Sequence, residues 1–103
     1  MTNNLTPTNE YFLFLLPVKA KTIKSLIDER LDMLEYQDSI IYHEFPDKNE
    51  LLRQLEMIYT SPTFPDSSED MKDLAWTMFM YEIVSRRNRY FEIISSTDST
   101  NLR

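Results

Sequence analysis

Residues 67–94 carry the longest stretch of helical periodicity in the chain. This stretch contains neither Gly nor Pro. It begins with Ser67, which can cap a helix, and Asp70 follows three residues later, where a helix amino end favours negative charge. The pattern predicts a single helix of roughly 40 Å, around which the rest of the chain is arranged.

The apolar residues of this predicted helix follow two rows. One row consists of Met71, Leu74, Ala75 and Met78, and continues toward Tyr81. The other consists of Trp76, Phe79, Met80, Ile83, Tyr90, Phe91 and Ile94, and is interrupted at Arg87. Because an amphipathic surface helix has one apolar face, a helix with two needs neighbours on both sides. These neighbours come either from its own chain or from a partner.

Two further segments have the helical period, residues 18–36 and residues 47–60. In the first, the recurring apolar residues are Ile23, Leu26, Ile27, Leu31 and Leu34. The second begins with the pair Asp47 and Glu50, a helix-start pattern, and continues with an amphipathic series. Between it and the long helix lies the linker 61–66, whose Phe64 we expect to pack back onto the core.

Two short apolar segments are ambiguous. The segment 8–16 favours a short helix, although residues 11–16 equally permit a strand, because periodicity cannot assign so short a run. Residues 39–45 either extend the preceding helix or form a strand. We therefore predict an all-α fold, a small antiparallel three- to four-helix bundle around the long C-terminal helix. The alternative is an α+β fold with strands at 11–16 and 39–45.

Composition supports the helical interpretation. The 103 residues include no Gly, and Gly is the usual residue for tight hairpin turns and for phosphate-binding loops. The length predicts a single helical domain over residues 1–103, with polar, disordered ends at 1–6 and 96–103. The run 11–16 is too short to cross a bilayer and lacks the basic leader of a signal peptide. We expect a cytoplasmic protein without a membrane partner.

Catalytic and metal-binding chemistry is sparse. The chain has one His and no Cys, so neither a thiolate site nor a site with several His ligands can form. The acids Asp28, Glu29 and Asp32 show no calcium-loop pattern, and a solvated face is the favoured interpretation. We therefore predict no catalytic residues, no metal site, no cofactor and no enzyme activity.

Charge is arranged against the helix dipole in residues 18–36. Lys19, Lys21 and Lys24 lie near the amino end, while the acids lie toward the carboxyl end. Both placements are unfavourable by about 0.3–1 kcal/mol per charge. A pair between Lys24 and Asp28 offsets part of this cost, and neutralisation by a neighbouring element or a partner is the alternative.

These observations favour a small, acidic, non-enzymatic protein of formal charge −6 that binds another protein or a second copy of itself. An inhibitor, an antagonist or an immunity-type protein fits this description. The predicted contact residues are Trp76, Phe79, Met80 and Ile83, with Arg86 and Arg87 as a charged edge.

A nucleic-acid-binding regulator is the second hypothesis, and nucleic acid is the less favoured partner because the chain is acidic. Its contact residues would be Lys19, Lys21, Lys24, Arg86, Arg87 and Arg89. The two basic clusters meet only if the first long helix runs antiparallel to the last.

Overall fold

The computed structural model describes the backbone of residues 6–101 and the side chains of residues 9–95. This part of the chain contains α-helices and one short 3-10 turn, with no strand. The elements are α1 (Thr6–Phe14), α2 (Val18–Asp32), η1 (Ile40–Tyr42), α3 (Lys48–Tyr59) and α4 (Glu69–Asn101). The predicted all-α class is confirmed. The α+β alternative is wrong, because residues 11–14 are helical and residues 39–45 contain only η1.

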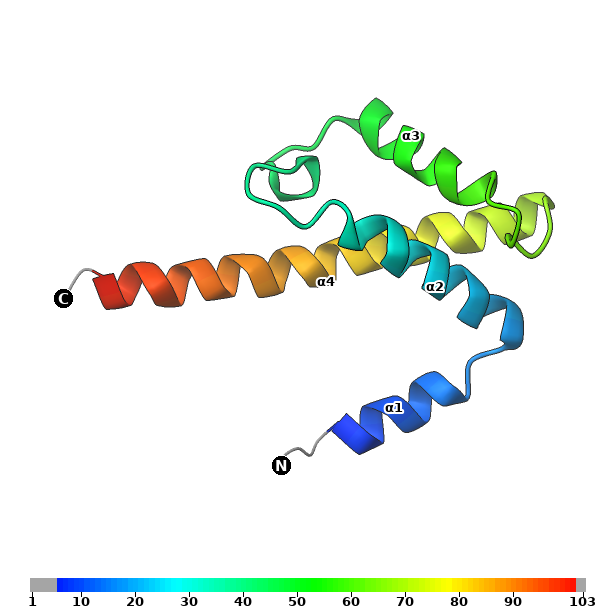
Figure 1. The fold of residues 1–103 in the computed structure, drawn as a ribbon, viewed down its shortest axis with the longest axis horizontal. Helices are drawn as coiled ribbons and strands as arrows, with labels where there is room; N and C mark the ends of the chain where they lie inside the picture. Colours follow the sequence, from blue (N-terminus) through cyan, green and yellow to red (C-terminus); the bar gives the residue numbers. More distant parts are fainter. Residues whose placement is uncertain (1–5, 102–103) are drawn as a thin grey trace.

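Successive helices alternate in direction from α2 to α3 to α4 (Figure 1). As a result, α2 and α4 run the same way across one another, and α3 lies antiparallel to both. The side-chain contacts agree with this arrangement. The end of α3 meets the start of α4, where the hydroxyl of Tyr59 donates to the carbonyl of Lys72 at 3.0 Å.

Helix α4 has 33 residues, a length of roughly 50 Å. Its cap is Ser68 and not the predicted Ser67, because the Ser68 hydroxyl accepts from the backbone N–H of Met71 at 3.2 Å. Asp66 fixes this cap by accepting from the Ser68 N–H at 2.8 Å. The helix continues to Asn101, although an irregular tail was predicted from residue 96. Residues 1–5 and 102–103, the rest of the predicted disordered ends, lie outside the described residues.

Helix α2 ends at Asp32, one turn before the predicted end at residue 36. The chain then turns through Asp38, whose φ is 69° and therefore in the left-handed region. In η1, the Ser39 hydroxyl caps the turn by accepting from Ile41 N–H at 3.4 Å. This path brings Leu34 and Ile41 into the same core.

Helix α3 begins as predicted. The Asp47 carboxylate accepts from the Glu50 N–H at 3.0 Å and satisfies one free donor of the first turn. The predicted packing of Phe64 onto the core is also found, since its ring meets that of Tyr59 edge-on, with ring centroids 5.6 Å apart.

The apolar core joins α2, η1, α3 and α4. Its buried members are Ile23, Ile27, Leu31, Leu34, Ile41, Tyr42, Leu55, Ile58, Ala75, Phe79 and Ile83. Helix α1 contributes no side chain to this buried set, and it diverges from the other helices in Figure 1. The radius of gyration is 15.9 Å, against about 13 Å for a compact chain of 100 residues. The protein is elongated because α4 and α1 extend beyond the core.

Candidate functional site

The six predicted partner-contact residues do not share one surface. Phe79, Ile83 and Arg86 are buried in the folded monomer, so they offer no surface to a partner. Trp76 remains 41% exposed, and Met80 is half-buried at the edge of the core. The six residues therefore divide into an inner group and an outer group.

Spacing along α4 explains the division. Ala75, Phe79 and Ile83 follow one another at intervals of four, and Arg86 lies three residues further on the same side of the helix. This single stripe faces the core, and it takes members from both of the predicted apolar rows. The sequence pattern identified the apolar positions, but it could not show which side the other helices would cover.

Arg86 occupies the centre of the contact between α2 and α4. Its Nη1 donates to Asp32 Oδ1 at 2.8 Å and to Glu35 Oε2 at 2.9 Å, while its Nε donates to Glu82 Oε2 at 3.0 Å. Its Nη2 lies 3.3 Å from Asp28 Oδ1. All five donor positions of a guanidinium lie in one plane, which suits several carboxylates at once. One side chain thus offsets part of the negative charge at the end of α2.

The electrostatics of this cluster favour a charged Arg86. Burial by itself would lower the pKa of Arg86, but the hydrogen bonds to Glu82 and Asp32 more than offset burial and raise that pKa above its usual value. The position at the carboxyl end of α2 adds the favourable end of the helix dipole. Lys24 pairs with Asp28 at 2.8 Å as the sequence predicted. Both of the proposed ways of offsetting the reversed charge of α2 are therefore found.

Arg87 is held by the η1 segment. Its Nη1 donates to the carbonyl oxygens of Ile41, at 2.9 Å, and of His43. Its guanidinium also lies over the ring of Phe91, 5.4 Å from the ring centroid. These contacts fasten η1 to α4, so Arg87 acts mainly within the fold.

The solvent-facing side of α4 carries an apolar surface that we call the outer face, formed by Trp76, Met80, Tyr81 and Val84 together with Asp73 and Thr77. Tyr81 is 74% exposed and Val84 is 51% exposed. A shallow hollow of about 470 Å³ lies between Asp73, Trp76, Thr77, Met80 and Tyr81. The two apolar rows predicted from the sequence place Tyr81 in the row of Met71 to Met78 and do not include Val84. The interval of four from Trp76 through Met80 to Val84 was the available signal.

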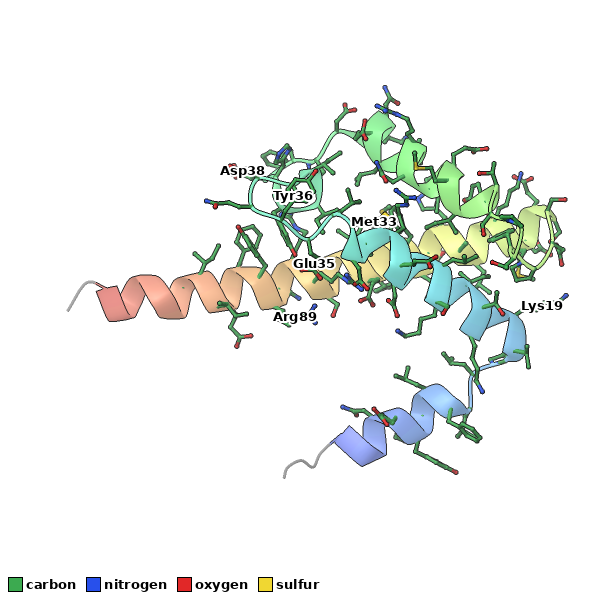
Figure 2. All side chains as sticks on the ribbon, viewed as in Figure 1. Lys19, Met33, Glu35, Tyr36, Asp38 and Arg89 are labelled. Atoms are coloured by element: carbon green, nitrogen blue, oxygen red, sulfur yellow. The ribbon has the colours of Figure 1, made fainter. Side chains whose placement is uncertain are left out.

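The residues of the predicted nucleic-acid surface do not converge. Lys19 lies 3.4 Å from Asp66, and Arg89 lies 3.5 Å from Glu35, with Lys19 and Arg89 far apart in Figure 2. Because α2 and α4 run the same way, Lys19 at the start of α2 is remote from the Arg86–Arg89 cluster, whereas Lys24 and Arg86 both contact Asp28. Lys21 lies over the ring of Phe14, 4.6 Å from its centroid. The patch of six cations is absent.

Within the described residues, no three His, Asp or Glu side chains are arranged to hold a metal ion. Asp28 and Asp32 instead contact the guanidinium of Arg86. The single histidine, His43, uses Nε2 in a 3.1 Å contact with the carbonyl of Asp38, which stabilises the turn before η1. None of the helices between residues 6 and 101 is both long enough and apolar enough to cross a membrane.

Comparison with known protein families, with curated proteins and with solved structures finds no significant match to this chain. The candidate site is therefore defined by its own geometry.

Proposed function

We propose that this chain is a small, non-enzymatic cytoplasmic protein that regulates another protein by binding it through the outer face of α4. An inhibitor, an antagonist or an immunity-type protein acts in this way. Trp76, Met80, Tyr81 and Val84 supply the apolar contact, and Asp73 supplies a charged edge.

The observation that carries the proposal is the exposure of three large apolar side chains, Trp76, Tyr81 and Val84, on one side of one helix, where the half-buried Met80 lies beside a shallow hollow. Exposed apolar surfaces of this kind mark binding sites for partners more often than they mark ordinary surface. Trp and Tyr are also the residues most enriched where a protein interface holds its binding energy. An α-helix with such a face fits a partner through contacts at intervals of three and four residues.

The net charge of the chain favours a partner with a basic surface. The formal charge of −6 favours a basic protein surface, since opposite charge accelerates encounter. It disfavours nucleic acid, and each described basic side chain of the second hypothesis lies against a side chain or backbone group of its own chain. No observation favours that second function.

The proposal is tested by comparing what three forms of the protein retain from an extract of the native host. Val84→Asp places a charge in the outer face, whereas Met33→Asp places the same charge in an exposed apolar position between α2 and α3. We expect one protein to be retained by the wild type and by Met33→Asp, and to be lost with Val84→Asp.

The retained protein, once purified, provides the second measurement. Trp76 is the only tryptophan, so its fluorescence reports on the outer face alone. Binding should shift its emission to shorter wavelength and protect it from a soluble quencher. If Val84→Asp and Met33→Asp retain the same proteins from the extract, the chain does not have the proposed function.

A further inference from the structure

Helix α1 and the turn after it carry a continuous run of exposed apolar side chains. The five consecutive residues Tyr11, Phe12, Leu13, Phe14 and Leu15 are between 46% and 72% exposed, and Val18 is 77% exposed. Consecutive residues of a helix point in different directions, so this segment is apolar on every side. A helix that is apolar all round is ordinarily enclosed by protein.

The rest of the chain encloses only one side of α1. Leu13 and Leu16 line an open hollow of about 240 Å³ with Ile27 of α2 and with Met78 and Tyr81 of α4. The other large side chains of α1 face away from this hollow and remain exposed. A nine-residue helix gains too little from its own hydrogen bonds to persist without packing.

We propose that α1 is a dimerisation element, and that the surface which covers it is α1 of a second copy of this chain. The two helices pack against each other across a two-fold axis. Tyr11, Phe12 and Leu15 of each copy then cover the hollow beside Leu13 and Leu16 of the other. This pairing shares only Tyr81 with the outer face of α4, and substitutions at Phe12 and Leu15 test it separately from the proposed function, which Val84→Asp tests.

The exposed area of α1 and the turn after it approaches what such a pairing needs. Taking about 200 Å² for a large side chain, the six exposed residues of α1 and its junction with α2 present roughly 700 Å². A stable interface takes about 800 Å² from each partner. In a two-fold pairing the same face serves both copies, so the required area is supplied twice by one short segment.

Charge also favours a second copy. Residues 11–18 carry no charge, and the charged rim of the hollow is neutralised within the chain, where Lys24 pairs with Asp28 and Glu82 with Arg86. A neutral, apolar segment is therefore the fitting occupant, and α1 is one. A membrane surface is a poorer match, since helices that lie on membranes carry a basic polar face, which α1 lacks.

Sedimentation from low to high micromolar concentration tests the pairing. The wild type should form dimers, and Phe12→Asp and Leu15→Asp should each raise the dissociation constant at least about tenfold. Val84→Asp is the matched control, because it adds the same charge to an apolar position outside α1, and its dimer should persist. Circular dichroism checks that each variant keeps its helices.

Cross-linking gives a measurement that does not require a disruptive change. The chain has no Cys, so Leu15→Cys introduces a single thiol directly after α1, and Lys48→Cys introduces one at the exposed start of α3. A short bifunctional thiol reagent should join copies of Leu15→Cys and leave Lys48→Cys mostly unjoined.

Four results would overturn the proposal. They are a wild type that stays monomeric at high micromolar concentration, a dimer that survives both α1 substitutions, equal cross-linking of the two thiol variants, and a monomer whose α1 binds vesicles of phosphatidylcholine and phosphatidylserine. The last result would assign α1 to a lipid surface.

Discussion

The guanidinium of Arg86 lies between four carboxylates, three of which come from α2 or the segment after it. Side chains four residues apart on a helix are neighbours, and Arg86 pairs with Glu82 in this way. The sequence did not predict the partners on α2, because contacts 51 to 58 residues apart depend on how the helices cross. Arg86 therefore makes one ion pair within α4 and others that join α4 to α2.

Replacing Arg86 by Met should lower the free energy of unfolding by about 3 kcal/mol. The change removes a buried cation from four carboxylates that are 29–71% exposed, and removing the buried partner of a charge network is destabilising. Arg89→Met is the matched control. Arg89 is exposed and its only described ion pair is with Glu35, so its loss should cost under about 1 kcal/mol.

Urea unfolding of both variants measures these costs. Equal losses of stability for Arg86→Met and Arg89→Met would contradict the central role of Arg86 in the contact between α2 and α4.

Tyr42 gives the fold a pH-dependent contact. Its ring stacks on Tyr90 with centroids 3.8 Å apart, and its hydroxyl donates to Glu35. Burial, reinforced by the hydrogen bond to Glu35, raises the pKa of Tyr42 from 10.0 to about 12. The folded state therefore retains a proton that the unfolded chain releases near pH 10.

The stability that Tyr42 contributes through its neutral hydroxyl should be complete below pH 10 and should be lost as the pH rises through about 12. Tyr42→Phe keeps the ring and removes the titration. The difference in unfolding free energy between wild type and Tyr42→Phe should therefore shrink across this interval. Denaturant unfolding at stepped pH measures it, and a constant difference would contradict the assignment.

At the scale of elements, the sequence predicted the helices better than their ends. The helical period identified α2, α3 and α4, and the Asp47 cap is where the sequence placed it. The cap of α4 lies one residue later than predicted, because Asp66 and Ser68 form a local hydrogen-bonded turn. Helix α2 ends earlier than predicted, and the chain turns away. In this path Leu34 and Ile41 pack in the core, and the acidic last turn of α2 contacts Arg86.

The turn between α2 and η1 depends on Asp38, the one described residue with positive φ. In a chain without Gly, Asp adopts the left-handed conformation at a cost of about 1 kcal/mol. Asp38→Gly should remove this cost while adding some freedom to the unfolded chain, for a net gain of up to about 1 kcal/mol.

Asp38→Val is the contrasting variant, because a β-branched residue does not tolerate positive φ, and it should lose at least about 1 kcal/mol. The midpoints of urea unfolding compare the two. A Val variant as stable as the Gly variant would show that the turn does not require a left-handed residue.

At the scale of the whole molecule, the sequence predicted a long helix that must pack against neighbours on two sides. It could not predict which side the other helices leave uncovered. The inner stripe of α4 is covered by α2, α3 and η1, whereas Tyr81 and Val84 are not. Of the predicted contact residues, Trp76 and Met80 lie on the outer face, and Phe79 and Ile83 complete the core. Coverage depends on the direction and crossing of neighbouring helices, and residue order alone leaves both open.

The distribution of the core leads to a final prediction, that residues 18–95 fold without the remainder of the chain. Every residue of the buried apolar core lies between Ile23 and Ile83, and α4 beyond Tyr90 has only exposed side chains up to Ser95. Removing α1 and the end of α4 exposes little of this core. The unfolding free energy of the monomer should change by no more than about 1 kcal/mol, since surface segments contribute little to global stability.

Urea unfolding makes the comparison, at a concentration where sedimentation finds the full-length chain monomeric. Amide exchange checks that residues 75–86 keep their protection. The same shortened chain lacks the dimerisation element and should sediment as a monomer at every concentration. Loss of cooperative unfolding would show that α1 is part of the core. A stable dimer of residues 18–95 would instead place the contact between copies outside α1. The two results therefore separate the stability of the fold from its self-association.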